Sequence, residues 1–160
     1  MPQIISIVGK SGSGKTTLLE KLVAELKKRG YKIGTIKHAS QGFDIDKEGK
    51  DSWRHRQAGA DTVVVASTGQ IAMVKDDLHE TLDDLEKYFP DMNLVITEGF
   101  KKEHKPKIEV FRAEKHRKPL CPDDSNLIAF VTNTKQNLSV PIFGLEEIKE
   151  LTDFLEKKYL

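Results

Sequence analysis

IISIVGKSGSGKT, residues 4–16, is the stretch that decides the fold. Four of its first five residues are apolar and β-branched, which predicts a buried strand that ends at Gly9. From Lys15 the apolar residues repeat with a helical period, and the basic residues before Gly30 end this helix. The stripe consists of Leu18, Leu19, Leu22, Val23 and Leu26. With a second strand predicted at Tyr31–Ile36, the order indicates the βαβ unit of a parallel sheet.

The rest of the chain continues to alternate strands and helices. Short apolar runs predict strands at Thr62–Ala66, Ile71–Val74, Leu94–Thr97, Ile108–Phe111 and Leu127–Thr132. The first two runs are joined by Ser67–Gln70, which has the length of a hairpin turn. Helices are predicted over Gly49–Ala60, along the stripe of Leu78, Leu82, Leu85 and Phe89, and along the stripe of Ile148, Leu151 and Leu155. This order favours an α/β fold with a mostly parallel sheet, flanking helices and an antiparallel hairpin.

The composition excludes several classes of protein. A chain of 160 residues with 38% hydrophobic residues can bury a core without disulfides, and its single cysteine, Cys121, cannot form an intrachain bridge. We find 26 Lys and Arg against 25 Asp and Glu, which gives no overall attraction to nucleic acid or to an anionic membrane. No apolar run approaches the roughly 18 residues of a membrane span. We therefore expect one soluble, cytoplasmic domain, residues 1–160, that binds neither nucleic acid nor membrane.

The near-zero net charge conceals two charged segments of opposite sign. Residues 76–91 hold seven acids and one base, whereas residues 101–118 hold eight bases and three acids. The basic segment, with Lys101, Lys102 and Lys105 at its start, follows a predicted strand end, where parallel sheets tend to bind ligands. It is either a solvated loop or, as we prefer, the binding site of a second phosphate-bearing ligand or an acidic partner.

Residues 9–16 match the phosphate-binding motif G-x-x-x-x-G-K-[ST] in full. Its glycines allow a tight turn that aims main-chain amides at phosphate oxygens, and the following helix adds its positive end. Lys15 would reach the β- and γ-phosphates, and the Thr16 hydroxyl would take a position on Mg²⁺. With a strand before it and a helix after it, this motif predicts a P-loop NTPase fold.

Two groups of carboxylates are candidates to support this loop. The strand Leu94–Thr97 ends in Glu98 and a glycine, an arrangement like the Walker B motif with Glu in place of Asp. Asp44 and Asp46 would project to one face of an extended segment, where they could share a cation or its water shell. Alternatively, these two aspartates cap the helix that follows.

Other reactive side chains give weaker signals. Lys50 and Arg54 share a helical face and Arg56 points elsewhere, so these cations either approach an anionic ligand or form a solvated face. His38 has no second histidine at metal spacing, and we do not expect a zinc site there. Cys121 has no activating neighbours in sequence and is predicted to be an inert or loosely exposed thiol.

With these residues identified, the chain resembles the MobB family of GTP-binding proteins, which act in the synthesis of molybdopterin-guanine dinucleotide. The resemblance rests on GKSGSGKTTLLEKL at residues 9–22, IKHASQGFDIDKEGKDSWRHRQAGAD at 36–61, VVVAS at 63–67, LVITEGFKKEHKPKIEVFR at 94–112, and the final helix. One departure is Ala39-Ser40-Gln41, where family members often carry a second histidine. A role for a histidine cluster is therefore not expected.

The resemblance implies a dimeric, cytoplasmic protein that binds GTP with Mg²⁺ and hydrolyses it slowly. Such a protein assists a partner guanylyltransferase in joining GMP to molybdopterin, so molybdopterin or its guanine dinucleotide is a further expected ligand. The implied nucleotide-binding residues are Gly9, Lys10, Ser11, Gly12, Ser13, Gly14, Lys15, Thr16 and Thr17. The implied metal site is Thr16, Asp46 and Glu98; Lys15, Asp46 and Glu98 would be catalytic; and Asp51, Arg54, Arg56, Lys101 and Lys102 would line a second-ligand site or dimer cleft.

Selection of guanine is not explained by a complete motif. GTPases commonly read the base with Asn/Thr-Lys-x-Asp, and Thr132–Asn137 lies where such a loop is expected but lacks the Asp. Asn133 is the remaining candidate.

Three other hypotheses stay open at this point. An ATP-dependent small-molecule kinase would also begin with a P-loop, although Lys115–Lys118 would make only a short lid. A non-enzymatic adapter would use the nucleotide only to switch its affinity for a partner. A metallocentre-assembly GTPase would typically need Cys or His ligands. A homodimer could form through the Val63–Val74 hairpin, which has enough apolar β character to extend a sheet.

Overall fold

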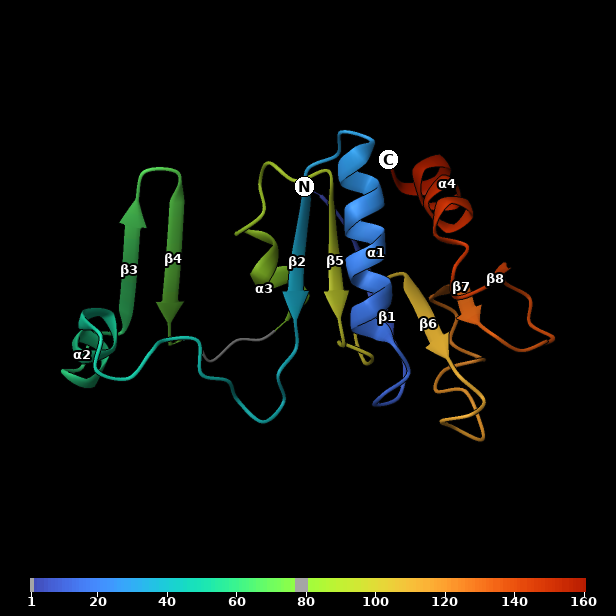
Figure 1. The fold of residues 1–160 in the computed structure, drawn as a ribbon, viewed down its shortest axis with the longest axis horizontal. Coiled ribbons are helices and arrows are strands. Elements are labelled where there is room, and N and C mark those ends of the chain that lie inside the picture. The colour runs from blue at the N-terminus through green and yellow to red at the C-terminus, as the bar shows by residue number, and fades with distance from the viewer. Residues whose placement is uncertain (1, 77–80) are drawn as a thin grey trace. The chain divides into compact units, whose positions relative to one another are not determined.

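The structure, a computed structural model, describes residues 2–76 and 81–160 and divides into two compact units (Figure 1). The large unit comprises Met1–His38 and Thr81–Leu160, and the small unit comprises Ala39–Glu80. The expectation of a single domain stays a prediction. Among the described residues, no helix has both the length and the apolar character needed to cross a membrane.

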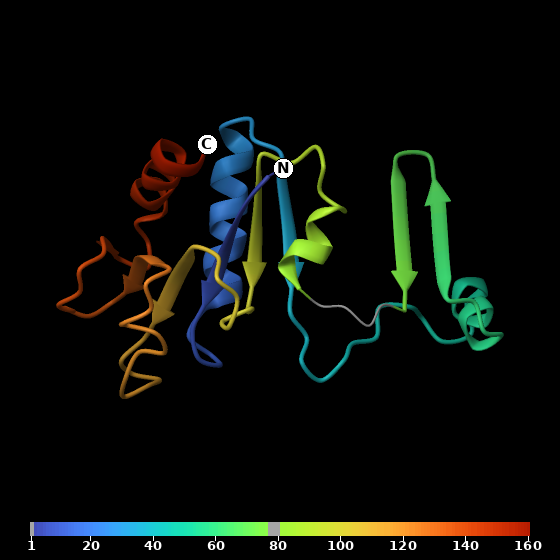
Figure 2. The same ribbon diagram turned by 180° about the vertical axis from the view of Figure 1, so that it is seen from behind.

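The large unit is built on a six-stranded, wholly parallel sheet in the order β2-β5-β1-β6-β7-β8. Its strands are β1 (Gln3–Val8), β2 (Ile33–Lys37), β5 (Leu94–Glu98), β6 (Lys107–Phe111), β7 (Leu127–Thr132) and β8 (Ile142–Phe143). The helices are α1 (Lys15–Lys28), α3 (Leu82–Glu86) and α4 (Ile148–Tyr159). Figures 1 and 2 show α1 lying along one face of the sheet. This is the predicted fold, an α/β P-loop architecture with a mostly parallel sheet.

The main core lies between the sheet and the helices α1 and α4. The predicted stripe of α1 faces it, with Leu22 and Leu26 fully buried and Leu18 nearly so. Alternate residues of β1 divide between the faces, because Ile5 and Ile7 join this core whereas Ile4 packs with α3 on the other side. Burying one such leucine side chain contributes roughly 1.5–3 kcal/mol, so this stripe fixes α1 on the sheet.

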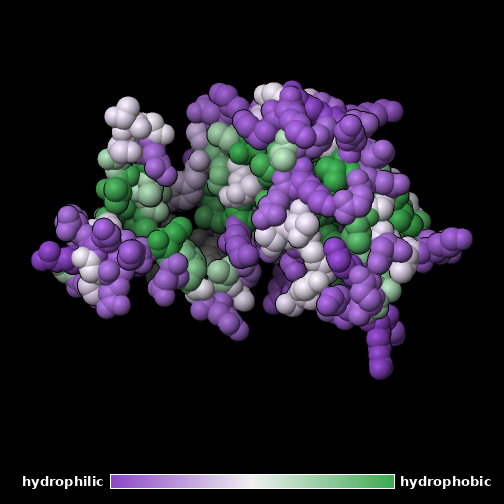
Figure 3. Space-filling model, viewed as in Figure 1, coloured by the Kyte–Doolittle hydropathy of each residue, from purple (hydrophilic) through white to green (hydrophobic). Residues whose placement is uncertain are grey.

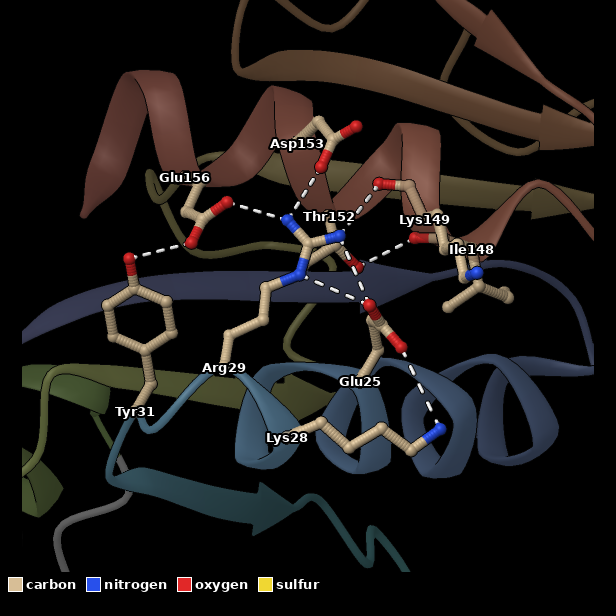
Figure 4. Close-up of polar contacts among 9 residues, drawn as sticks. All are labelled: Glu25, Lys28, Arg29, Tyr31, Ile148, Lys149, Thr152, Asp153 and Glu156. Atoms are coloured by element: carbon tan, nitrogen blue, oxygen red, sulfur yellow. Dashed lines mark hydrogen bonds and ion pairs between the residues drawn. The ribbon is translucent and has the colours of Figure 1, made fainter.

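Arg29 joins the end of α1 to α4 (Figure 4). One of its terminal nitrogens donates to Asp153 and Glu156, each at 2.6 Å, and its guanidinium also binds Glu25 at 3.1 Å. Tyr31 donates its hydroxyl to the other oxygen of Glu156 at 2.8 Å. The hydrogen bonds of Arg29, above all the one with Asp153, raise the pKa of its guanidinium further above its usual range. The junction is therefore a permanent cation that holds three carboxylates.

The small unit contains α2 (Asp51–Gln57) and an antiparallel hairpin of β3 (Thr62–Ser67) and β4 (Gln70–Lys75). The predicted hairpin is confirmed, and each strand is one residue longer at the turn than predicted, because Ser67 pairs with Gln70. The remaining two turn residues end in Gly69, whose positive φ of 84° suits such a tight connection. Figure 3 shows apolar side chains gathered over this hairpin. The side chains of Val64, Ile71 and Met73 lie on the same face of the hairpin and are 55%, 74% and 45% exposed.

Several predicted boundaries differ from the structure. The strand β2 begins at Ile33 and not at Tyr31, because the Tyr31 amide donates to Leu26 and closes α1 beyond a left-handed Gly30. The helix α2 is shorter than the predicted Gly49–Ala60, since Gly49 and Gly59 both take positive φ angles at its ends. Of the predicted third helix, Phe89 lies beyond α3 and Leu78 lies outside the described residues. The short strand β8 was not predicted.

Candidate functional site

The loop between β1 and α1 fits tightly against the neighbouring strand β6. Gly9, Gly12 and Gly14 take positive φ angles of 148°, 73° and 99°. A Cβ atom on Gly9 would lie 2.5 Å from the carbonyl oxygen of Val110, so only glycine fits there. The sequence pattern of glycines thus reflects both the turn itself and its close approach to the sheet.

The main chain of this loop forms a nest for an anion. Within the described residues, Ser13 is the one residue of 11–14 whose amide donates to a protein acceptor, the Lys10 carbonyl at 3.2 Å. The other amides precede the N-terminus of the 14-residue helix α1, whose dipole favours negative charge. Amides in a loop of left-handed glycines are a general phosphate-binding arrangement.

Lys15 supplies a cation at the same place. Its ammonium donates to the Lys10 carbonyl at 3.0 Å, so the side chain folds back over the loop. Burial lowers the pKa of Lys15, Glu98 opposes this effect, and Lys37 adds to it. The ammonium is therefore partly desolvated, which strengthens its interaction with an anionic ligand.

Glu98 lies directly beside Thr16. The hydroxyl oxygen of Thr16 is 3.0 Å from both carboxylate oxygens, and the Lys37 ammonium lies 3.4 Å from one of them. The pairing of Glu98 with Ile7 in adjacent strands explains this meeting, because it brings the end of β5 next to the loop that leaves β1. The adjoining cleft, of about 370 Å³, is lined by Ser11, Gly12, Gly14, Lys15, Thr16, Thr17 and Glu98.

The turn after Glu98 contains two consecutive residues with positive φ angles, Gly99 and Phe100. Phe100 has a positive φ of 54°, and a Cβ on the preceding Gly99 would approach the Cβ of His38 to 3.0 Å. The His38 ring packs on Phe100 with centroids 4.8 Å apart. In the part of the chain that the structure describes, we find no group of three or more His, Cys, Asp or Glu side chains placed to hold a metal.

The connection between β6 and β7 also reaches the loop, which sequence reasoning missed. Lys10 donates its ammonium to the Lys118 carbonyl at 2.7 Å, and the His116 ring lies 2.8 Å from the Ser11 carbonyl. Arg112 lies within 3.3 Å of a Cβ position on Gly14. The position of Arg112 after a predicted parallel strand was the available signal, since such strands end at one edge of the sheet.

Asn133 follows β7 and donates its side-chain amide to Glu114 at 2.9 Å. This hydrogen bond is the main cause that lowers the pKa of Glu114. Asn133 lines a hollow together with Thr132, Thr134, Lys135, Gln136, Ile142 and Gly144. The loop after β7 therefore borders an open hollow, and a role of Asn133 in binding the guanine base stays a prediction.

The remaining candidate residues of the middle segment lie in the small unit. Asp46 accepts a hydrogen bond from the Ser52 hydroxyl at 2.8 Å, and its other oxygen is buried with no hydrogen-bond partner among the described residues. Arg56 pairs with Asp76 at 2.9 Å. A pocket of about 270 Å³ is lined by Asp44, Ile45, Asp46, Trp53, Arg56, Gln57 and Asp76. Asp44 and Asp46 both line this pocket together with the intervening Ile45, and a cation shared between the two carboxylates stays a prediction.

Not all predicted site residues are brought together. Thr16 and Glu98 meet in the large unit, whereas Asp46 belongs to the small unit, and its role in a shared metal site stays a prediction. The same holds for Asp51, Arg54 and Arg56 at a cleft, of which Asp51 and Arg54 are exposed on α2. Lys101 and Lys102 are exposed in the turn that follows Phe100.

Comparisons with known proteins agree with this architecture. Residues 4–133 match the sequence profile of MobB, described as molybdopterin guanine dinucleotide synthesis protein B. The chain is 40% identical over 156 residues to the molybdopterin-guanine dinucleotide biosynthesis adapter protein of Haemophilus influenzae, covering 96% of this chain and 87% of that protein. The adapter protein of the same name from Escherichia coli K12 is 36% identical over 161 residues, covering 97% and 92%.

Solved structures match over nearly the whole chain. The crystal structure of Bacillus subtilis MobB superposes with a TM-score of 0.80 at 27% identity and covers 99% of this chain and 98% of that one. A MobB homologue from Bacillus stearothermophilus gives a TM-score of 0.72 at 26% identity, with coverage of 98% and 97%. Profile, relatives and structures agree, and the chain belongs to the MobB family of molybdopterin guanine dinucleotide synthesis proteins.

Proposed function

We propose that this protein is a GTP-binding adapter that hydrolyses GTP slowly and assists a partner guanylyltransferase in attaching GMP to molybdopterin in the cytoplasm. The observation that carries the proposal is the anion nest of residues 9–17 with Lys15 folded over it and Glu98 at its edge. The names of the relatives support the adapter role, since they are called biosynthesis adapter proteins.

The large unit offers distinct groups for each part of a triphosphate. Loop amides and the start of α1 would bind the phosphate oxygens, and Lys15 would leave the Lys10 carbonyl to bind the β- and γ-phosphates. Fixed donors of this kind stabilise charge that develops on the transferred phosphoryl group, because they need no reorganisation during the reaction.

The residues present fit Mg²⁺. Thr16 offers a hydroxyl oxygen and Glu98 a carboxylate at 3.0 Å from it, and hard oxygen ligands of this kind are those that Mg²⁺ prefers. When bound, the ion would neutralise phosphate charge. We also propose Asp46 as a metal ligand, as the family resemblance implies.

Slow hydrolysis follows from the partners of Glu98. A general base must face the attacking water, but the carboxylate of Glu98 already contacts the Thr16 hydroxyl and the Lys37 ammonium. We therefore propose that Glu98 and Asp46 orient water and metal, and we expect turnover well below the roughly 10 per second of a median enzyme. Asn133 would contact the guanine base.

The exposed apolar face of the hairpin supports a homodimer. Val64, Ile71 and Met73 lie together on it, and apolar side chains of this kind are normally buried by a partner. A second copy could pack its own hairpin on this face symmetrically. Asp51, Arg54, Arg56, Lys101 and Lys102 would then contact molybdopterin, its guanine dinucleotide or the guanylyltransferase.

Calorimetric titration of GTP, GDP and ATP, with and without Mg²⁺, tests the proposal. We expect GTP to bind more tightly than ATP, and Lys15→Ala to weaken GTP binding and hydrolysis at least tenfold through loss of a charge-assisted contact. Lys27→Ala, which removes an exposed lysine near the other end of the same helix, is the matched control and should change neither quantity. Equal GTP binding by the wild type and Lys15→Ala would refute the assignment.

A second measurement separates an adapter that switches from one that does not. Affinity for the guanylyltransferase is measured with GDP and with a non-hydrolysable GTP analogue. A nucleotide switch requires the GDP-bound and GTP-bound protein to bind the guanylyltransferase with different affinities. Equal affinities would therefore exclude a switch.

A further inference from the structure

Strand β6 buries two charged side chains. Lys107 and Glu109 are 2% and 1% exposed, two residues apart, and therefore on the same face of the strand. Buried charges are costly unless they are paired or hydrogen-bonded. Partners of this pair must therefore lie on the face of β6 opposite to that covered by α1 and α4, where Phe111 packs as well.

These partners belong to the connection between β6 and β7, residues 112–126. Glu109 accepts hydrogen bonds from the amides of Leu120 and Cys121, one on each carboxylate oxygen, and from the Cys121 thiol at 3.2 Å. Lys107 donates to Asp124 at 2.7 Å. The connection thus returns over the face of β6 and is held to it at two points, by charged side chains in place of a packed helix.

The part of the connection that precedes these anchors lies on the phosphate-binding loop. Lys118 accepts from Lys10, and His116 contacts the Ser11 carbonyl. The segment 112–118 carries four Lys or Arg residues against one Glu. We call it the cationic wall.

Arg112, in the cationic wall, lies beside the start of α1. Its guanidinium borders Gly14 and, with Thr17, lines a small cleft beside the loop. Its Nε atom is buried without a hydrogen-bond acceptor in the described part of the chain. One terminal nitrogen of Arg112 lies 3.9 Å from Glu114, and the guanidinium keeps further donors for a phosphate oxygen at the edge of the anion nest.

We propose that Glu109 is a positioning residue for phosphate recognition, which holds the cationic wall against the loop so that Arg112 binds a nucleotide phosphate. The inference deepens the proposed function and rests on it. Glu109 binds the amides of Leu120 and Cys121, which follow Lys118 closely in the chain. These hydrogen bonds therefore hold the Lys118 carbonyl where it accepts from the Lys10 ammonium. Release of these amides would let the wall move away from the nest.

Titration of GTP in the presence of Mg²⁺ tests this chain of contacts. Arg112→Gln and Glu109→Gln are each expected to weaken binding roughly tenfold or more, the effect of one lost charge-assisted hydrogen bond. The Gln variant keeps the shape of Glu109 but turns a donor toward one of the two amides. Cys121→Ala is the matched control, because it removes the thiol contact and keeps both amide contacts, and it should bind GTP as the wild type does.

Leu155→Ala controls for loss of stability alone. Leu155 is fully buried in the core on α4, so this variant is destabilised without a change at the wall, and its GTP affinity should stay that of the wild type. Wild-type binding by either Glu109→Gln or Arg112→Gln would overturn the inference and leave the proposed function intact. A wild-type protein that binds no GTP would instead refute the proposed function.

Alkylation of Cys121 gives a readout that needs no variant to fold. Because the thiol is held by the same carboxylate as the wall, it should react only when the connection opens locally. Binding that requires a closed wall must oppose this opening, so saturating GTP should slow alkylation of the wild type by the iodoacetamide probe at least fivefold, a coupling of ordinary size. An alkylation rate that GTP does not change would overturn the inference.

Discussion

Replacement of Asp124 by Asn should expose the cost of the second anchor of the β6–β7 connection. The ammonium of Lys107 is 2.7 Å from Asp124, and the two side chains are 3% and 21% exposed. Breaking a buried pair from one side costs about 3–5 kcal/mol because the other charge stays buried. Partial solvation of Asp124 places the expected loss at the lower end, about 3 kcal/mol. At roughly 2–4 °C per kcal/mol for a chain of this length, Tm should fall by about 6–12 °C.

Unfolding of this variant is followed by far-UV circular dichroism in urea and on heating. The single tryptophan, Trp53, lies in the small unit, and its fluorescence would not report on the large unit. Combination with Lys107→Met removes the orphaned charge, so the double variant should regain at least half of the lost free energy. A loss below about 1 kcal/mol for Asp124→Asn, or a double variant no more stable than it, would refute the reasoning.

The same pair predicts a pH dependence with a definite sign. The hydrogen bond from Lys107 is the main cause that lowers the pKa of Asp124 below its ordinary 3.8. A carboxylate with a lowered folded pKa contributes stability above its unfolded pKa and loses it as the pH falls through the folded value. The stability difference between wild type and Asp124→Asn should therefore be complete near neutral pH and shrink below about pH 3.8.

Three further perturbations test the large unit. Gly34→Ala would place a Cβ 2.4 Å from a ring carbon of Phe89, so urea unfolding should show a loss of about 1–3 kcal/mol, and wild-type stability would contradict this packing. Burial and then Glu109 raise the pKa of Cys121 to about 12, so at pH 8 its alkylation should be much slower in the folded protein than in the urea-unfolded chain, and equal rates would contradict the raised pKa. Arg29→Ala should lower Tm and increase hydrogen exchange in α4, whereas unchanged exchange would show that the junction of Figure 4 does not hold this helix.

Local chemistry explains which parts of the fold could be predicted from the sequence. The apolar runs and the helical stripe of α1 are confirmed because each signal lies within a few residues and depends on one face of one element. The start of β2 was misjudged, because Tyr31 looks like a strand residue but its amide donates to the Leu26 carbonyl and closes α1. The two-residue strand β8 has no periodicity at all and exists only because β7 offers an edge.

The residues of the candidate site that could be predicted are likewise those with a local signal in the sequence. The glycines and Lys15 could be found because a phosphate nest is contiguous in sequence. Glu98 was found through its strand, and the parallel pairing of β5 with β1 brings it to Thr16. Arg112 and Glu109 could not be assigned roles, because their partners depend on the path of an irregular connection that no period predicts.

That connection explains why a buried strand tolerates charge. A helix between β6 and β7 would cover this face with apolar side chains but would satisfy its own amides internally. An irregular segment leaves amides that need acceptors, and Glu109 supplies acceptors for two of them while Lys107 binds the carboxylate of a third residue. Charged side chains on this face of β6 provide less stability than apolar ones would. They nevertheless fix the path of residues 112–118 over the phosphate-binding loop. Selection for stability alone would favour the helix, so the buried charges of β6 are best explained by what they hold in place.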